Sequence, residues 1–289
     1  MSSAKTAAGP VFLLEKVSYH YPGGEIGVRD LDLLIHEQER IVLLGANGSG
    51  KSTLLKVLDG LLFPQEGSIQ AFGQALQEKS LNDDGFNHAF RRRVGFVFPN
   101  SETQLFSSTV WDEIAFGPLH LGLGEAEVRQ RVTEVLELFG LEGLKDRPPF
   151  KLSGGEKKRV ALASVMATNP AVLLLDEPTV ALDPRTRRWL IDMLSQFGQF
   201  GKTLITATHD LDIVEEIADR VLVFSEDHRV VADGTPAELL SDRDLLFRVN
   251  LIDPRFHKHA HDGDHRHYHL HDLKQGPERV PGPGECNQK

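Results

Sequence analysis

The most informative stretch of this chain is Gly45-Ala46-Asn47-Gly48-Ser49-Gly50-Lys51-Ser52-Thr53. It follows the apolar run 41–44 and precedes a helix-like segment that begins at Leu54. A strand, a glycine-rich turn and a helix start are the context of a phosphate-binding loop. Glycines let consecutive main-chain N–H groups converge on an anion, and the helix N-terminus adds partial positive charge. We therefore expect Lys51 to reach the terminal phosphates of a nucleotide and Ser52 to ligate Mg²⁺.

The bulk properties are those of an ordinary globular protein. The chain has 289 residues, a hydrophobic fraction of 40% and a formal charge of −10, which argues against nucleic acid as the main partner. No apolar run approaches the ~18 residues that span a bilayer, and the N-terminus lacks the apolar core of a secretory signal. The single cysteine, Cys286, excludes an internal disulfide framework and suits a reducing cytosol.

Strand-like and helix-like segments alternate along the chain. Residues 171–175 and 203–208 are apolar runs of strand length, as in a parallel sheet covered on both faces, and 220–224 with 229–232 predict a hairpin. Helical periodicity marks much of 109–145, and further helices are expected from Ser153 and from Asp183. Residues 74–93 are expected to be a loop with a helical piece. The alternation favours an α/β nucleotide-binding core.

Two carboxylates follow the run 173–175. A carboxylate at the end of a buried strand holds Mg²⁺ in phosphoryl-transfer sites. Because successive strand residues point to opposite faces, Asp176 and Glu177 cannot do the same job unless the strand ends between them. We assign Asp176 to the metal and Glu177 to polarising the attacking water.

The segment Leu152-Ser153-Gly154-Gly155-Glu156 is the second decisive motif. Ser153 and Glu156 have capping-box spacing, which by itself indicates a helix start. That interpretation leaves the paired glycines unexplained. Two glycines at a helix N-terminus expose main-chain amides to a ligand phosphate, as at residues 45–50.

Together these motifs give the chain a family resemblance: it resembles an ATP-binding subunit of the ATP-binding-cassette (ABC) superfamily. The phosphate loop, the LSGGE signature, LLLDEP at 173–178, Ala181-Leu182-Asp183 and Thr208-His209-Asp210 occur in the family's order. The resemblance covers roughly residues 11–245. It implies a RecA-like parallel-sheet core, an antiparallel β subdomain and a helical signature subdomain at about 100–165.

The resemblance also implies a site shared by two chains. In a head-to-tail dimer, each ATP with its Mg²⁺ would lie between the phosphate loop of one protomer and Ser153, Gly154, Gly155 and Glu156 of the other. His209 would contact the γ-phosphate, Asp183 would link the two sites, and Tyr21 matches the position that stacks on adenine. From the residues alone, Tyr21 is equally readable as a core tyrosine that flanks a turn.

One position departs from the family pattern. After the strand 94–98 the family usually has a glutamine that touches Mg²⁺ and senses the membrane partner. Here that position is Pro99, which has no side-chain oxygen and no N–H. Gln104 or Asn100 is expected to replace it from a shifted loop, or else water completes the metal shell.

Residues 97–106 and 114–118 are similar to ATPases of energy-coupling-factor importers, which take up vitamins or cobalt and nickel ions. This implies a peripheral location on the cytoplasmic face of the cell membrane, an integral membrane coupling protein, a substrate-binding membrane subunit and a second ATPase protomer. One complete motif set favours a homodimer, although a heterodimer is also compatible.

Residues 246–289 are expected to form a flexible, histidine-rich tail. Neutral imidazole is a good ligand for Ni²⁺ and Co²⁺, so the tail favours a metal substrate over a vitamin; in the alternative, the tail is solvated and binds metal only adventitiously. The candidate ligands are His257, His259, His261, His265, His267, His269 and His271. Five other histidines are expected to be ordinary surface or core residues: His20, His36, His88, His120 and His228.

The leading hypothesis is therefore the ATPase of a nickel or cobalt importer. The alternatives are the ATPase of a vitamin importer and a soluble ABC ATPase outside transport. In a further alternative the chain is a metal-storage or chaperone protein whose tail is the function.

Overall fold

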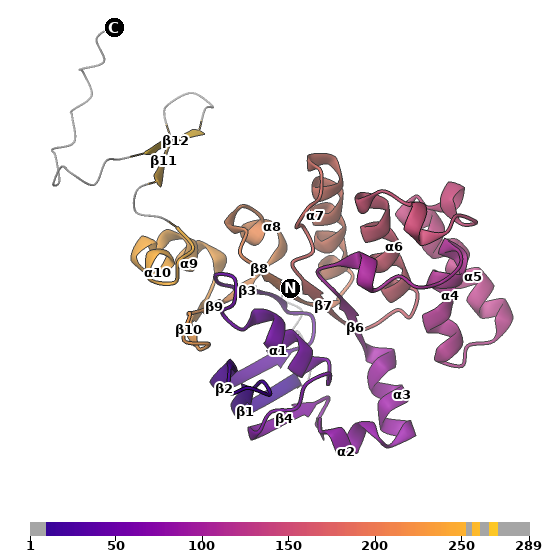
Figure 1. Ribbon diagram of the computed structural model, residues 1–289, viewed down its shortest axis with the longest axis horizontal. Helices are drawn as coiled ribbons and strands as arrows, with labels where there is room; N and C mark the ends of the chain where they lie inside the picture. The colour runs from indigo at the N-terminus through magenta and orange to yellow at the C-terminus, as the bar shows by residue number, and fades with distance from the viewer. Residues whose placement is uncertain (1–9, 253–255, 261–265, 271–289) are drawn as a thin grey trace, which may run out of the picture.

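The computed structural model describes residues 10–252, 256–260 and 266–270 (Figure 1). A six-stranded sheet, in the order β10-β9-β3-β8-β7-β6, forms its centre. All neighbours in it are parallel except β10, which forms the predicted hairpin with β9. The strands are β3 (Arg40–Leu44), β6 (Val94–Val97), β7 (Val172–Asp176), β8 (Thr203–Thr208), β9 (Arg220–Phe224) and β10 (Val230–Gly234).

Both faces of this sheet are covered, which explains why its strands are continuously apolar. Alternate residues of one strand belong to two separate hydrophobic clusters: Leu173 and Leu175 pack in one, and Leu174 packs in the other. The cluster around Leu174 includes α1 (Lys51–Leu58) and the antiparallel sheet. The opposite cluster includes α7 (Pro184–Gln199) and α8 (Val214–Ile217).

A second, antiparallel sheet has the order β2-β1-β4-β5. Its strands are β1 (Pro10–His20), β2 (Ile26–His36), β4 (Glu66–Ala71) and β5 (Gln74–Ala75). β1 and β2 are longer than their apolar runs suggest, because ladder pairing continues through exposed residues towards the turn at 21–25. This turn brings Tyr21 towards the phosphate loop.

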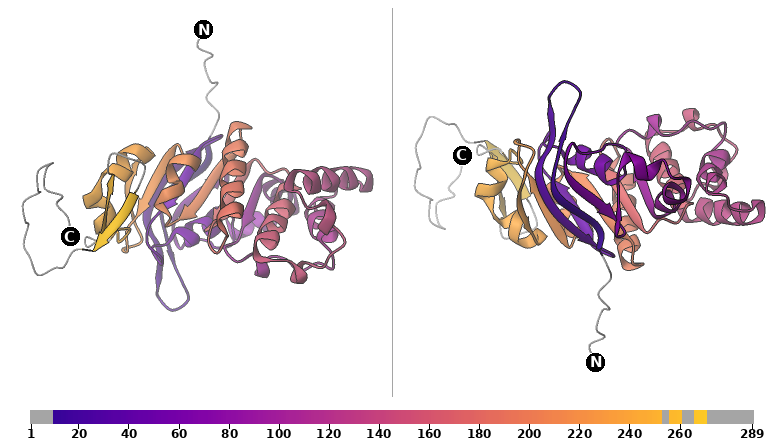
Figure 2. Two further views of the ribbon diagram at one scale, coloured as in Figure 1. Left: turned by 90° about the horizontal axis from the view of Figure 1, so that it is seen from above. Right: turned by 90° about the horizontal axis from the view of Figure 1, so that it is seen from below.

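A helical region forms one end of the molecule, on the far side of β6 from β9 and β10 (Figure 1, Figure 2). Its helices pack on one another: α4 (Val110–His120), α5 (Glu125–Phe139) and α6 (Gly154–Met166). Short 3₁₀ turns complete it: Ser101–Thr103, Glu142–Leu144 and Pro149–Lys151. The predicted α/β class, with its parallel core, antiparallel subdomain and helical subdomain, is confirmed.

Two expectations differ from the structure. Residues 74–93 hold more helix than expected, in α2 (Glu78–Leu81) and α3 (Asp84–Arg93), because Asp83 caps α3 and Phe90 anchors it in the core. The expected end of the ATP-binding domain at residue 245 falls inside α10 (Arg243–Arg248). Leu246 and Val249 are buried there, so the packed core continues past that point.

The remaining described elements follow β8. They are the 3₁₀ turn Leu211–Ile213, α9 (Pro236–Ser241), and a hairpin of β11 (Phe256–Ala260) and β12 (Arg266–Leu270). Much of the tail that was expected to be flexible, including His261, His265 and His271, lies outside the described residues. Within the described ranges, no helix is both long and apolar enough to cross a bilayer.

Candidate functional site

The phosphate loop joins β3 to α1 at the carboxyl edge of the parallel sheet. Gly50 is the N-cap of α1 and has φ of 105°, a left-handed conformation that favours glycine. A Cβ at Gly50 would lie 2.2 Å from the carbonyl oxygen of Gly27, which no side chain tolerates. The glycine therefore allows β2 to pack directly over the loop.

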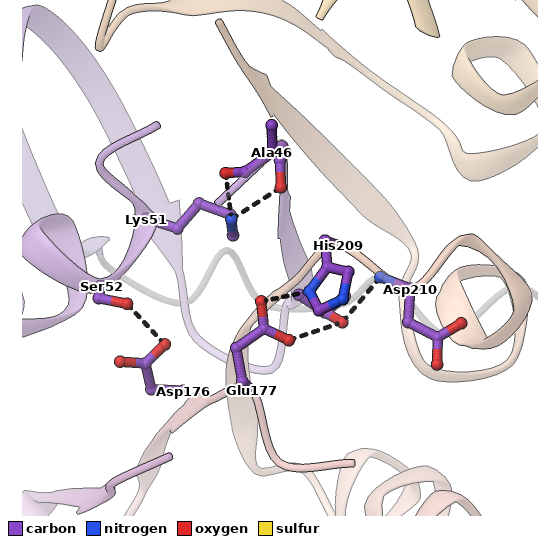
Figure 3. A network of polar contacts seen from close by, with 9 residues as sticks. Ala46, Lys51, Ser52, Asp176, Glu177, His209 and Asp210 are labelled. Carbon is purple, nitrogen blue, oxygen red and sulfur yellow. Dashed lines mark hydrogen bonds and ion pairs between the residues drawn. The ribbon is translucent and has the colours of Figure 1, made fainter. Parts of the chain in front are cut away.

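Lys51 is the first residue of α1 and is 5% exposed. Its Nζ donates to the carbonyl oxygens of Gly45 at 2.7 Å and Ala46 at 2.9 Å (Figure 3). Burial lowers the pKa of Lys51, and the charges of Glu177 and Asp176 oppose that shift. The structure thus holds a partly desolvated cation over the loop, where an anion gains most from it.

Tyr21 and the loop line one cavity of about 600 Å³. The Tyr21 hydroxyl is 2.9 Å from Oγ1 of Thr53, and its ring meets Tyr19 edge to face at 5.0 Å. Tyr21 is therefore a fixed wall of the cavity and not a core tyrosine remote from it. Adenine stacking on this ring stays a prediction. The other lining residues are 24–27, 47–53, Glu177 and His228.

Ser52 and Asp176 meet where the metal was predicted. The Ser52 hydroxyl donates to Oδ1 of Asp176 at 2.8 Å (Figure 3). Burial raises the pKa of Asp176, whereas the Ser52 hydrogen bond lowers it. A hydroxyl and a carboxylate in contact form a set of hard oxygen donors, so these residues fit Mg²⁺. When bound there, Mg²⁺ would neutralise phosphate charge.

Glu177 turns away from Asp176, because β7 ends between them. Glu177 has φ of 44°, a strained conformation for a residue other than glycine. Its Oε1 lies 2.9 Å from Nδ1 of His209, and its Oε2 accepts from the Thr208 hydroxyl at 3.4 Å (Figure 3). The end of β7 would have allowed a shared role, yet the two adjacent carboxylates contact different partners, which fits the separate roles assigned to them.

The segment after β8 is tied to α7. Thr208 Oγ1 accepts from the N–H of Asp210 at 3.1 Å, and the Asp210 carboxylate pairs with Arg187 at 2.6 Å. His209 is held between these anchored neighbours, with its side chain 45% exposed. This exposure leaves the ring accessible, and its contact with the γ-phosphate stays a prediction.

The signature residues form a complete capping box. The N–H of Ser153 donates to Glu156 Oε2 at 2.8 Å, and the N–H of Glu156 donates to Ser153 Oγ at 3.4 Å. Gly155 lies close to α7, because a Cβ there would be 3.6 Å from Oδ2 of Asp183. Asp183 is itself the N-cap of α7, and accepts from the N–H groups of Arg185 and Thr186 at 3.0 and 3.1 Å.

The signature and the phosphate loop do not meet within one chain. In the described residues, the cavity around the loop has no wall from Ser153, Gly154, Gly155 or Asp183. A role for these residues in binding ATP therefore requires a second chain.

Gln104 does not reach the metal position in this structure. Its Oε1 accepts from the N–H of Phe98 at 3.1 Å, and its Nε2 donates to the Ala161 carbonyl at 3.3 Å. Asn100 caps the turn 101–103 by accepting from the N–H of Glu102 at 2.9 Å. Both amides are used by the main chain, so the substitute for a glutamine at Pro99 lies elsewhere or is water.

Sequence reasoning missed three residues of this region. His228 was expected to be ordinary, yet it lines the cavity, and its Nδ1 is buried without a partner among the described residues. Thr208 supports Glu177, and Lys158 is buried beneath the end of β6. Lys158 was detectable as a lysine within the otherwise apolar face of a helix.

Comparison with known proteins identifies the family. The family model described as ABC transporter matches residues 28–180. The nickel import ATP-binding protein NikO of Rhodobacter capsulatus is 51% identical over 246 residues, covering 84% of this chain and 96% of that protein. Three further relatives are described only as putative ABC transporter ATP-binding proteins. The chain belongs to the ABC transporter ATP-binding family.

Solved structures agree. CbiO1 of Clostridium perfringens, described as part of the complex CbiONQ, superposes with a TM-score of 0.71 at 36% identity, covering 85% of this chain and 96% of that one. The cassette MJ0796, solved as a dimer with ADP and Pi after hydrolysis, gives 0.70 at 28% identity, with coverages of 78% and 98%. The protein is thus an ATP-hydrolysing subunit of a transporter.

The geometry at Ser52 leads to a prediction on metal use. Ser52→Ala removes a hydroxyl ligand, so we expect the Mg²⁺ concentration for half-maximal ATP hydrolysis to rise by about tenfold. Ser241→Ala, which removes a hydroxyl from α9, is the control. An unchanged Mg²⁺ titration in Ser52→Ala would exclude Ser52 from the metal shell.

Proposed function

We propose that this chain is the peripheral ATPase on the cytoplasmic face of a membrane importer for Ni²⁺ or Co²⁺. The observation that supports ATP hydrolysis is the cluster of Lys51, Ser52, Asp176, Glu177 and His209 at one sheet edge. In it, Ser52 and Asp176 hold Mg²⁺, Glu177 polarises the attacking water, and His209 orients it with the γ-phosphate.

The proposal includes a homodimer with two composite sites. Gly154 has open space where its side chain would be, and the Ser153 end of α6 is exposed, so main-chain amides there are accessible to a partner's nucleotide. Each chain carries both a full phosphate loop and a full signature, so two identical copies suffice. The dimeric form of MJ0796 supports this arrangement.

The membrane partner is proposed to dock on the helical region. A groove of about 570 Å³ between α4 and α5 is lined by Trp111, Ala115, Phe116 and Leu119, with Asp112, Glu125 and Arg129 among its polar residues. Phe106, Phe116 and Leu119 are large apolar side chains that remain 66%, 48% and 52% exposed. An apolar floor with charged residues beside it suits a short amphipathic helix of a membrane subunit. The description of CbiO1 as part of a transporter complex supports such a partner.

The metal substrate is supported by the register of β11 and β12. His257 stands opposite His269, and His259 stands opposite His267. Alternate positions of an antiparallel pair share a face, so these four histidines occupy one face of the hairpin. The name of NikO as a nickel import protein points to the same substrate class.

The substitution Glu177→Gln tests the proposed role of Glu177 in ATP hydrolysis. The substitution keeps the size of the side chain but removes its charge, so we expect hydrolysis to fall by at least about 10²-fold while ATP binding persists. ATP turnover and retained nucleotide are measured together, with the exposed Glu137→Gln as control. Turnover at the wild-type rate in Glu177→Gln would remove Glu177 from this role.

Phe116→Glu tests the docking surface. A charge in the groove opposes burial of an apolar partner, so we expect the variant to leave the membrane fraction of its native host and to keep its ATPase activity in solution. Phe200→Glu is the control, because Phe200 is 80% exposed and lies at the end of α7. Equal membrane association of both variants would contradict docking at α4 and α5.

Substitution of the hairpin histidines tests the proposed metal substrate. Replacing His257, His259, His267 and His269 by alanine should weaken Ni²⁺ or Co²⁺ binding by at least about tenfold, measured by calorimetry. The control replaces His261, His265 and His271, which lie outside the described residues. Equal losses in both variants would contradict a site on the hairpin face. Uptake of a vitamin in place of either ion by the reconstituted importer would contradict the substrate assignment.

A further inference from the structure

Lys158 is a buried lysine in the first half of α6. It is 3% exposed, although lysine is almost never fully buried unless it is paired. Its Nζ donates to the carbonyl oxygens of Phe98 at 3.2 Å and Pro99 at 3.3 Å. The ammonium group therefore holds the chain just beyond β6, five residues after the signature serine that starts its own helix.

The surroundings of Lys158 belong to the catalytic edge of the sheet. β6 is the parallel neighbour of β7, with Val97 in register with Leu175, so Phe98 and Pro99 leave the sheet beside Asp176 and Glu177. Burial lowers the pKa of Lys158 to about 8, and the charges of Asp176 and Glu177 act in the opposite direction. Lys158 thus lies within the electrostatic field of both carboxylates.

The side chain of Gln104 also connects the end of β6 to α6. Gln104, from the loop after β6, accepts from the N–H of Phe98 and donates to the carbonyl of Ala161 in α6. Both polar main-chain groups of Phe98 are therefore joined to α6, one through Gln104 and one through Lys158. The start of α6 and the end of β6 are linked at two points.

We propose that Lys158 is a positioning residue that couples the signature end of α6 to the catalytic carboxylates of its own chain. This inference rests on the proposed composite site, in which Ser153–Gly155 contact the nucleotide held by the partner. A phosphate that draws the start of α6 forward moves Lys158 with it, and the carbonyls of Phe98 and Pro99 follow. When the signature of one chain closes on the partner's nucleotide, the carboxylates that hydrolyse the chain's own nucleotide are thereby aligned.

The neighbouring Lys157 provides a matched comparison. It is also on α6, but it forms an ion pair with Glu102, in which the lysine side chain is 15% exposed and the carboxylate side chain is 65% exposed. Because the carboxylate is open to solvent, this ion pair is expected to contribute little to stability. Lys158 therefore binds main-chain carbonyls and Lys157 binds a side-chain carboxylate, although both are lysines of the same helix.

The experiment compares steady-state ATP hydrolysis by Lys158→Met, Lys158→Arg and Lys157→Met in the full chain, per site that binds ATP. We expect Lys158→Met to lower kcat by at least about tenfold with KM within about threefold of wild type, because the phosphate loop is intact. We also expect its Hill coefficient for ATP to fall towards 1, because coupling between sites is lost. Lys158→Arg keeps the cation and its donors and should restore both quantities, and Lys157→Met should match wild type.

Three results would overturn the proposal: wild-type kcat and Hill coefficient in Lys158→Met, no restoration by Lys158→Arg, or equal defects in Lys157→Met and Lys158→Met. If Lys158→Met does not fold, Lys158→Gln, which keeps one donor without the charge, takes its place in the comparison with Lys158→Arg. Failure of the composite site itself is distinguishable, because Glu177→Gln would then not accumulate as an ATP-bound dimer.

Discussion

A buried cluster of opposite charges at the carboxyl edge of the parallel sheet is the constraint on which the rest of the site depends. Lys51 and Asp176 are both withdrawn from water, so burial lowers the pKa of the lysine and raises that of the aspartate. Each charged form is therefore costly without a partner. A bound phosphate with its cation would remove that cost for both, which makes this site receptive to a magnesium nucleotide.

The sheet places these charges through its topology. β3 leads into the phosphate loop, β7 ends at Asp176 with Glu177 directly after it, and β8, which lies between β3 and β7, ends at Thr208 before His209. Parallel strands bring their carboxyl ends to one edge, so three separate stretches of sequence converge without a long loop. The turn at Glu177 then divides two adjacent carboxylates between a metal position and a histidine.

Much of this arrangement could be predicted from sequence because it depends on local patterns. The glycines at 45–50, the apolar run before Asp176 and the capping box at Ser153 each specify a short segment with a known geometry. The α/β class followed from the alternation of strand-like and helix-like segments along the chain. The family assignment followed from the order of the motifs.

What could not be predicted depends on contacts between distant segments. Lys158 becomes part of the catalytic edge only because α6 packs beneath β6; a lysine in an apolar helix face indicates burial, but it does not indicate which strand the lysine meets. His228 reaches the cavity through the turn between β9 and β10, which lies beside the phosphate loop only in the folded chain. Gln104 looked available for a metal, but the main chain of Phe98 and Ala161 already occupies its amide.

The double use of Asp183 has a consequence for genetics. Its carboxylate is the N-cap of α7, and a Cβ at Gly155 would lie 3.6 Å from its Oδ2. Any side chain that cannot accept two amide hydrogens would fray that helix and disturb the glycine together. Loss-of-function substitutions at Asp183 would therefore combine loss of the helix cap with a changed contact at Gly155, and asparagine, which keeps an oxygen that can accept both amide hydrogens, is a substitution that separates the two effects.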